Sequence, residues 1–480
     1  MSKLKRLAGE TVLYGLGSIV PRFLNFLLVP LHTNAFSPEQ YGVLSKLLAY
    51  VAVLNVIFTF GMETAYFRFA TKDGADEQKV FNLAQTVVVI ISFVLSGALL
   101  LLAPSIAGIM DIAGHDDLVM WLAAIMFIDA VVAIPFARLR LKKKPLQFAV
   151  GKLTNIGLLM VLNFYFLKIA FNPSVGVGYV VLANLLANAF YLLFFARSLL
   201  SWRPVIDRSI SPAMFSYAYP VMLTGLAGVT NEMFSRQTLD WWLPANFYAN
   251  QTPARALGIF SACYKLAMLM NLTVQAFRYA AEPFFFSNAV DKNSPALFAR
   301  VNHYFIIVCC VLLLGAGINL DILKYFLGNA TYWEGVNIVP ILLLAYLFLG
   351  VYYNLTVWFK LTDKTIYGTL ITVGGAVVTI AANFLLIPTL GYLGSSIATL
   401  LCYFSMTVGC YLLGQKYYPI PYQVGKSMAY IIVTTAIVYA TNSIIIPNFW
   451  VGTAVHGAII VSFVLVVYLL EKNPFRQPAT

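Results

Sequence analysis

Charged side chains are scarce in this sequence. They make up 10% of its 480 residues, against about 25% in an ordinary soluble domain, whereas hydrophobic residues make up 60%. Apolar runs long enough to cross a bilayer follow one another along the chain, and no polar block of domain size lies between them. The composition therefore excludes a soluble protein and predicts that the membrane part is the whole protein.

The residue patterns of metal, nucleotide and catalytic sites are also missing. The five cysteines lie inside apolar runs, and neither they nor the four histidines have metal-ligand spacing. The phosphate-binding pattern GxxxxGK[ST] fails because residue 420 is isoleucine. A membrane glycosyltransferase or polymerase would need paired carboxylates in an outer loop, but the longest such loop, 235–255, contains only Asp240. We therefore expect neither a cofactor or metal nor enzyme activity.

The hydropathy pattern predicts an all-α membrane protein with about fourteen spans, whose ends are uncertain by roughly 2–4 residues. We place the helices at 12–33, 41–63, 82–103, 118–137, 147–168, 175–196, 213–233, 256–277, 301–320, 336–358, 366–387, 392–414, 427–446 and 450–470.

Basic residues predict the orientation of these spans. Twenty-three of the 31 Lys and Arg residues lie in the two tails and in the loops on the same side. Loops on the other side hold only four: Lys168, Arg236, Arg255 and Lys324. Because short cytoplasmic loops retain Lys and Arg, both termini are predicted to be cytoplasmic. The net charge of +12 is spread over these loops, so we expect no nucleic-acid binding.

The two halves of the sequence repeat one another. YGVLSKLLAY, from position 41, matches LGIFSACYKL, from position 257, and pairs Gly42 with Gly258 at an offset of 216. Further matches at offsets of 220 and 215 pair Asn163 with Asn383 and place NPSVG over IPTLG. Three matches at nearly one offset indicate a duplication.

The repeat predicts how the chain is divided. Matched helices are six apart and therefore run in the same direction, as in transporters built from two parallel bundles with a cavity between them. We expect a six-helix bundle in residues 1–208, a second in 209–418, and two additional transmembrane helices in 419–480.

Three stretches resemble the multidrug/oligosaccharidyl-lipid/polysaccharide exporter superfamily, and within it the polysaccharide transporter branch. They are YGLGSIVPRFLNFLLVPLHTNAFSPEQYGVLS from position 14, RLRLKKKPLQ from 138 and NFLLIPTLGYLGSSIATLLCY from 383. The resemblance covers the whole chain. It implies a flippase that moves an anionic lipid-linked oligosaccharide across the inner (cytoplasmic) membrane by alternating access during surface polysaccharide biosynthesis.

The resemblance also implies partners. The substrate would be a polyprenyl-pyrophosphate-linked oligosaccharide in contact with membrane lipid. H+ or Na+ would be the coupling ion, and polysaccharide polymerase or glycosyltransferases would be neighbours. Two alternatives within the superfamily stay open: an ion-coupled multidrug or cation antiporter, and a peptidoglycan-precursor flippase.

Ionisable residues inside spans are costly and are candidates for function. Lys46 and Lys152 lie about five residues from a helix end, so their side chains could reach the membrane surface. Arg22, Lys265 and Asp129 lie roughly 13–16 Å deep at 1.5 Å per residue, which is too far for that explanation.

Arg22 belongs to a polar stripe on the first helix. Gly15, Ser18, Arg22 and Asn25 recur at helical spacing. Pro21 beside them would kink the helix, which is tolerated where a cavity satisfies the freed carbonyl. The sequence therefore predicts a cavity wall.

We predict that Arg22 and Lys265 converge from the two bundles on a pyrophosphate, because an arginine donates in parallel to two oxygens. The full predicted substrate-binding set is Arg22, Asn25, Lys265, Lys46 and Lys152. The alternative is that Arg22 only pairs with Asp129. Asp129 and Glu63 are the candidate ion-coupling carboxylates, since a carboxylate in the membrane can change its charge as the cavity opens to each side.

Overall fold

The computed structural model describes residues 3–471, apart from 111, 113, 250–251, 289–292 and 445. These residues form helices and loops, with no strand among them. The helices are α1 (Lys3–Phe26), α2 (Val29–Ala35), α3 (Pro38–Thr59), α4 (Met62–Ala70), α5 (Glu77–Leu101), α6 (Ala103–Ile109), α7 (Asp116–Leu141), α8 (Pro145–Phe164), η1 (Tyr165–Ile169), α9 (Gly178–Phe194), α10 (Ala196–Leu200), α11 (Ser211–Trp242), α12 (Pro253–Asn288), α13 (Ser294–Ile318), α14 (Leu320–Leu323), η2 (Lys324–Phe326), η3 (Ala330–Ile338), α15 (Val339–Leu355), α16 (Val357–Leu361), α17 (Ile366–Leu390), α18 (Tyr392–Tyr417), α19 (Val424–Asn442) and α20 (Phe449–Leu470).

The predicted all-α membrane fold is confirmed. Within the described part of the chain, eleven helices are long and apolar enough to cross a membrane. The other three predicted spans correspond to α1, to α9, which has 17 residues, and to α11. The count of fourteen spans therefore stays a prediction.

Two predicted helices are each broken in two. The predicted span 12–33 is interrupted at Leu27 and Leu28, because Pro30 has no N–H to donate to the helix. The predicted span 41–63 is interrupted at Gly61, whose φ of +68° favours glycine. A Cβ there would also lie 2.6 Å from the carbonyl oxygen of Ala218.

Two other helices are longer than predicted. α11 continues to Trp242 and α12 to Asn288, instead of ending at 233 and 277. Arg236 therefore lies buried within α11, not in an outer loop, and Arg278 lies within α12, not in an inner loop. Most basic residues still lie in loops and helix ends on the predicted cytoplasmic side, so this correction leaves the predicted orientation in place.

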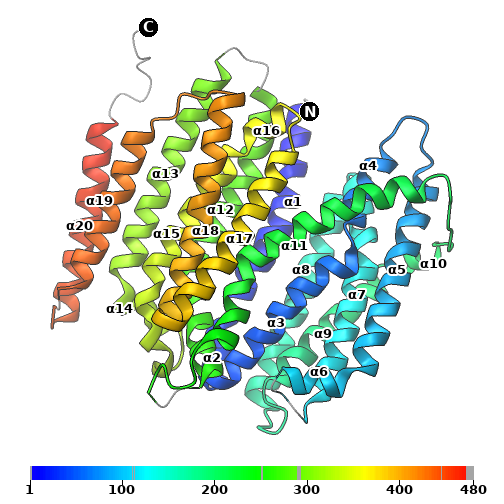
Figure 1. Cartoon of the computed structure of the whole chain (residues 1–480), viewed down its shortest axis with the longest axis horizontal. Helices are drawn as coiled ribbons and strands as arrows, with labels where there is room; N and C mark the ends of the chain where they lie inside the picture. The colour runs from blue at the N-terminus through cyan, green and yellow to red at the C-terminus, as the bar shows by residue number, and fades with distance from the viewer. Residues whose placement is uncertain are drawn as a thin grey trace.

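The helix packing repeats along the chain. In the first half α1 packs on α8, α3 on α5 and α7, and α9 on α7 and α8. In the second half α11 packs on α17, α12 on α13 and α15, and α18 on α15 and α17. α19 and α20 pack against α13 at the edge of the molecule (Figure 1). This pattern supports the predicted parallel repeat, while the boundaries at 208 and 418 remain proposals.

The two halves meet at a pair of glycines. A Cβ on Gly42 of α3 would lie 2.0 Å from the carbonyl oxygen of Ala254, and one on Gly258 of α12 would lie 1.8 Å from that of Pro38. Pro38 and Ala254 are 216 positions apart in the sequence, and so are Gly42 and Gly258. This spacing is the offset of the sequence repeat. The repeat-related glycines therefore lie on an approximate twofold axis, where the backbones of α3 and α12 touch.

Polar contacts surround this crossing. Lys46 Nζ lies 2.5 Å from Asp240 Oδ2, and both side chains are nearly buried. Arg255 lies 3.4 Å from Glu39 and 3.3 Å from Glu334. We call the glycine crossing and these ion pairs the outer closure, because the starts of α3 and α12 lie on the side opposite both described ends of the chain (Figure 1), the side predicted to face outward.

The orientation can be tested by labelling. Ser174, in the loop before α9, and Lys144, at the start of α8, are both exposed but lie on opposite sides. In intact cells, Ser174→Cys should react with an impermeant thiol reagent and Lys144→Cys should not. Reaction at position 144 in cells shown to be unbroken would reverse the predicted topology. The five native cysteines are buried and leave a low background.

Candidate functional site

Arg22 faces the second half of the molecule. α1 packs on α8 through Gly17, and its end is held by Phe26, whose ring stacks on Phe326 at 4.6 Å. The Arg22 side chain is exposed and lies within electrostatic reach of Tyr353 on α15. No described residue forms a hydrogen bond or ion pair with Arg22. Its charge is therefore available to a ligand between α1 and α15.

Lys265 lies on α12, next to two charged groups of α11. It interacts electrostatically with Glu232 and Arg236, and also with His32 of α2. Arg236 is 6% exposed, and its guanidinium lies 4.4 Å from the centre of the Tyr264 ring. Tyr353 lies within electrostatic reach of both Glu232 and Arg22. The convergence of Arg22 and Lys265 on one ligand stays a prediction.

We call Arg22, Glu232, Arg236 and Lys265 the central cationic cluster. Three cations and one carboxylate leave two net positive charges between α1, α11 and α12. Charge at membrane depth is costly unless it is paired. Arg236 Nε is buried and has no hydrogen-bond partner among the described residues. The cluster can therefore bind a doubly negative group, whose oxygens would satisfy these donors.

Asp129 lies in a separate site within the first half. Its carboxylate accepts a 2.9 Å hydrogen bond from Asn188 Nδ2 of α9 and interacts electrostatically with Lys152 of α8. The Lys152 ammonium lies 4.1 Å from the centre of the Phe136 ring. The partners of Asp129 thus come from α8 and α9, and the alternative in which Asp129 pairs with Arg22 is not what the structure contains.

The other predicted residues are held elsewhere. Lys46 is engaged by Asp240 in the outer closure, and Glu63 pairs with Arg140 where α4 meets α7. Asn25 is exposed on α1, one turn from Arg22. Arg22 is linked to Lys265 only indirectly, through Tyr353 and Glu232, whereas Lys152 interacts with Asp129. A role for Lys46 and Lys152 in substrate binding stays a prediction.

Sequence reasoning missed that one face of α11 carries charges for two sites. Glu232, Arg236 and Asp240 recur at i, i+4 and i+8 and so lie on one face of the helix. That spacing is visible in the sequence and indicates that the helix continues past residue 233. The polarity of the segment suggested a loop instead.

The chain matches a family model in sequence and solved membrane-protein structures in fold. A family model described as polysaccharide biosynthesis protein matches residues 35–302. A lipid II flippase MurJ in an inward closed conformation shares the fold with a TM-score of 0.67 at 11% identity, over 97% of this chain and 100% of that one. An inward-facing multidrug resistance MATE family transporter of the MOP superfamily gives a TM-score of 0.63 at 13% identity, over 88% and 98%. No curated protein matches the sequence.

Proposed function

The chain belongs to the polysaccharide biosynthesis protein family, and from this premise we propose that it is a multi-pass membrane transporter of the MOP superfamily that flips a lipid-linked oligosaccharide. The substrate is an oligosaccharide joined through pyrophosphate to a polyprenyl lipid. The protein carries the headgroup across the inner membrane by alternating access, with both termini on the cytoplasmic side. The lipid tail stays in the bilayer.

The central cationic cluster is the observation that carries this proposal. A pyrophosphate esterified at both ends keeps one negative charge on each phosphorus, which matches the two net positive charges of the cluster. Arg22 has a planar fork that can donate to two oxygens at once. Lys265 supplies a point charge from the facing bundle. The two bundles would separate first on one side of the membrane and then on the other. A pyrophosphate bound between them would thereby pass from one membrane face to the other.

The charge of the cluster separates this function from its alternatives. A multidrug or cation antiporter would need an excess of carboxylates in the cavity, whereas the central cationic cluster contains three cations and one carboxylate. A peptidoglycan-precursor flippase would use the same pyrophosphate, and the fold shared with a lipid II flippase favours it as the second candidate. The glycan distinguishes the two. Glycosyltransferases on the cytoplasmic side would supply either substrate, and a polymerase on the outer side would consume it.

Flipping can be measured in proteoliposomes. Vesicles carrying the purified protein would receive a polyprenyl-pyrophosphate-linked oligosaccharide in both leaflets, and an added glycosidase would digest only the outward-facing glycan. Protein-free vesicles should stop at about half digestion, and vesicles with the protein should go to completion. A plateau at half digestion for both this substrate and lipid II would refute the proposal. Completion with lipid II alone would favour the second candidate.

The carboxylate of Asp129 is the proposed coupling site. Asp129→Asn keeps the geometry of the Asn188 contact but cannot change charge, so flipping driven by a proton or sodium gradient should fall about tenfold or more. Asp207→Asn is the matched control, since Asp207 lies in the loop before α11 and pairs with Lys79. The measurement compares initial flipping rates with and without each gradient. Equal rates for Asp129→Asn and the wild type under both gradients would leave Asp129 a structural role only.

A further inference from the structure

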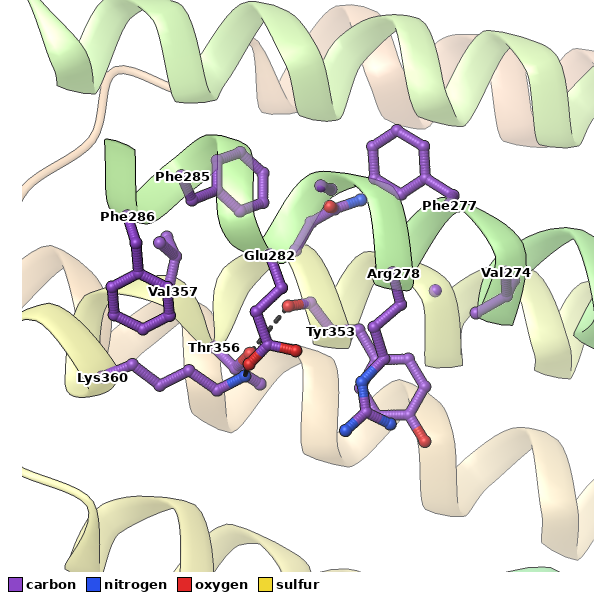
Figure 2. A pocket seen from close by; sticks show the side chains of 13 residues that line it. Val274, Phe277, Arg278, Glu282, Phe285, Phe286, Tyr353, Thr356, Val357 and Lys360 are labelled. Atoms are coloured by element: carbon purple, nitrogen blue, oxygen red, sulfur yellow. Dashed lines mark hydrogen bonds and ion pairs between the residues drawn. The ribbon is translucent and has the colours of Figure 1, made fainter. Parts of the chain in front are cut away.

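A cleft lies between α18 and α19 in the second half of the molecule. Its volume is about 120 Å³, close to that of an engineered apolar cavity of about 150 Å³ that binds benzene. Figure 2 shows a smaller hollow, between α12 and α15–α16, in which Lys360 pairs with Glu282. That hollow measures about 20 Å³, which is room for one water molecule. The α18–α19 cleft, in contrast, has room for part of a ligand.

The cleft faces the bilayer. Buried side chains of α13 and α15, among them Ile306 and Phe348, form its floor. The rim comes from α18 and α19, where Phe404, Val408 and Val424 are exposed. Both rim helices are long and apolar enough to cross a membrane, so their exposed side chains contact lipid. The molecule that enters the cleft is therefore a membrane lipid.

The two ends of the cleft differ in polarity. Asn302 of α13 and Ser427 of α19 line the end nearer the predicted cytoplasmic side, because both helices begin on that side. Ile306 and Ile431 lie four residues further along the same two helices, roughly 6 Å deeper at 1.5 Å per residue. The cleft is thus polar near the membrane surface and apolar below it, which is the polarity of a phospholipid.

Asn302 is the residue that points to a bound ligand. Its side chain is 6% exposed, and its Oδ1 has no hydrogen-bond partner among the described residues. Neighbouring polar groups are paired: Ser427 Oγ lies 3.1 Å from His303 Nδ1, and Thr407 Oγ1 donates to the carbonyl oxygen of Phe348 at 2.9 Å. A buried acceptor without a donor is costly. A headgroup that brings an N–H or O–H donor to this end would remove that cost.

We propose that the cleft binds one resident phospholipid with a donor-bearing headgroup, of the phosphatidylethanolamine kind. The ethanolamine ammonium donates to Asn302 Oδ1, and an acyl chain lies against Ile306 and Ile431. The walls are α13, α15, α18 and α19, none of which belongs to the first half. The lipid therefore stays in place when the two halves move, unlike a transported lipid, which must bind between them. It fills the space that helix packing leaves between α18 and α19.

Two phospholipids that differ only at the headgroup nitrogen test this assignment. Phosphatidylethanolamine and phosphatidylcholine are used with the same acyl chains, since the choline nitrogen carries three methyl groups and no N–H. The purified full-length protein is titrated with each lipid, and native mass spectrometry counts the bound molecules. The wild type should bind one phosphatidylethanolamine at least about tenfold more tightly, the effect of one charge-assisted hydrogen bond. Asn302→Leu should bind the two lipids equally.

A second variant fills the cleft. Val408 lines the cleft on α18 and is exposed, so Val408→Trp should occupy the space of the acyl chain. Affinity for both lipids should then fall at least about tenfold, the loss of roughly two buried methylenes. Val377→Trp is the matched control, because Val377 is an exposed valine of α17 outside the cleft. It should leave both affinities at the wild-type level.

The wild type alone can overturn the headgroup assignment, by binding both lipids with equal affinity. The cleft itself is the wrong site if Val408→Trp and Val377→Trp change lipid binding to the same extent, because the lipid would then lie on the general surface. Thermal unfolding checks the remaining variant. A lower unfolding temperature for Asn302→Leu with the lipid preference intact would make Asn302 structural and overturn its role in binding.

Discussion

Replacing Arg22 with alanine should lower the flipping rate at least about 100-fold, because it removes the bidentate donor that we place on the pyrophosphate. Arg22→Lys keeps the charge but loses the fork, so it should retain part of the activity. The measurement is the initial rate of glycan exposure in the proteoliposome assay. Gel filtration and thermal unfolding of each variant control for folding.

A double mutant distinguishes substrate binding from helix pairing. If Arg22 served only to neutralise Asp129, Arg22→Ala combined with Asp129→Asn would recover wild-type flipping. We expect no recovery, because Asp129 is already held by Asn188 and Lys152. Wild-type rates in the double mutant would refute the substrate-binding role of Arg22.

Adding one methyl group at Gly258 should break the outer closure. The new Cβ would lie 1.8 Å from the carbonyl oxygen of Pro38, so α3 and α12 must separate. Overpacking of this kind costs about 1–3 kcal/mol, or roughly 5- to 150-fold in a conformational equilibrium. Gly258→Ala should therefore shift the protein toward a state open to the outside and lower the flipping rate by a factor in that range.

A buried reporter can detect this opening. Ser261, one turn along α12, is 2% exposed, so Ser261→Cys should be protected from an impermeant thiol reagent when Gly258 is present and should react when Gly258→Ala is added. Gly409→Ala is the matched control, because a Cβ there meets nothing within 4 Å. In Gly258→Ala, the thiol at position 261 could stay protected and the flipping rate could stay at the wild-type level. That result would show that the glycine crossing does not close the protein on the outer side.

Much of the fold was predictable because, in a membrane protein, the local sequence strongly constrains where the helices lie. A span must be apolar along its length and must satisfy its own backbone, so each predicted segment overlaps a described helix, although only eleven helices qualify as spans by length and composition. The alignment of Gly42 with Gly258 was also visible, since duplication preserves positions that the packing requires. The sequence did not predict that each of these glycines contacts the helix of the other. A repeat offset aligns positions but gives no distance between them in space.

The candidate site was predictable only in part. The depth and polar stripe of Arg22 can be counted along one helix, and the repeat places Lys265 in the facing bundle. We placed Glu232 at the end of a span and Arg236 in a loop, because a hydropathy scale scores every residue as if its side chain contacted lipid. Their partners on α12 and α15 are brought to them by helix packing, which hydropathy does not describe.

The sequence by itself determined that this is an all-helical membrane protein with a repeated half, a basic side and deep charges on its first and eighth predicted spans. These properties follow from residue type and spacing along single helices. Only the tertiary structure decided that α11 and α12 extend past their apolar stretches, that Lys46 pairs with Asp240, and that Asn302 and Val408 line one cleft. The physical reason is that a polar group inside a membrane is tolerated or not according to its partner, and those partners are brought together only by helix packing.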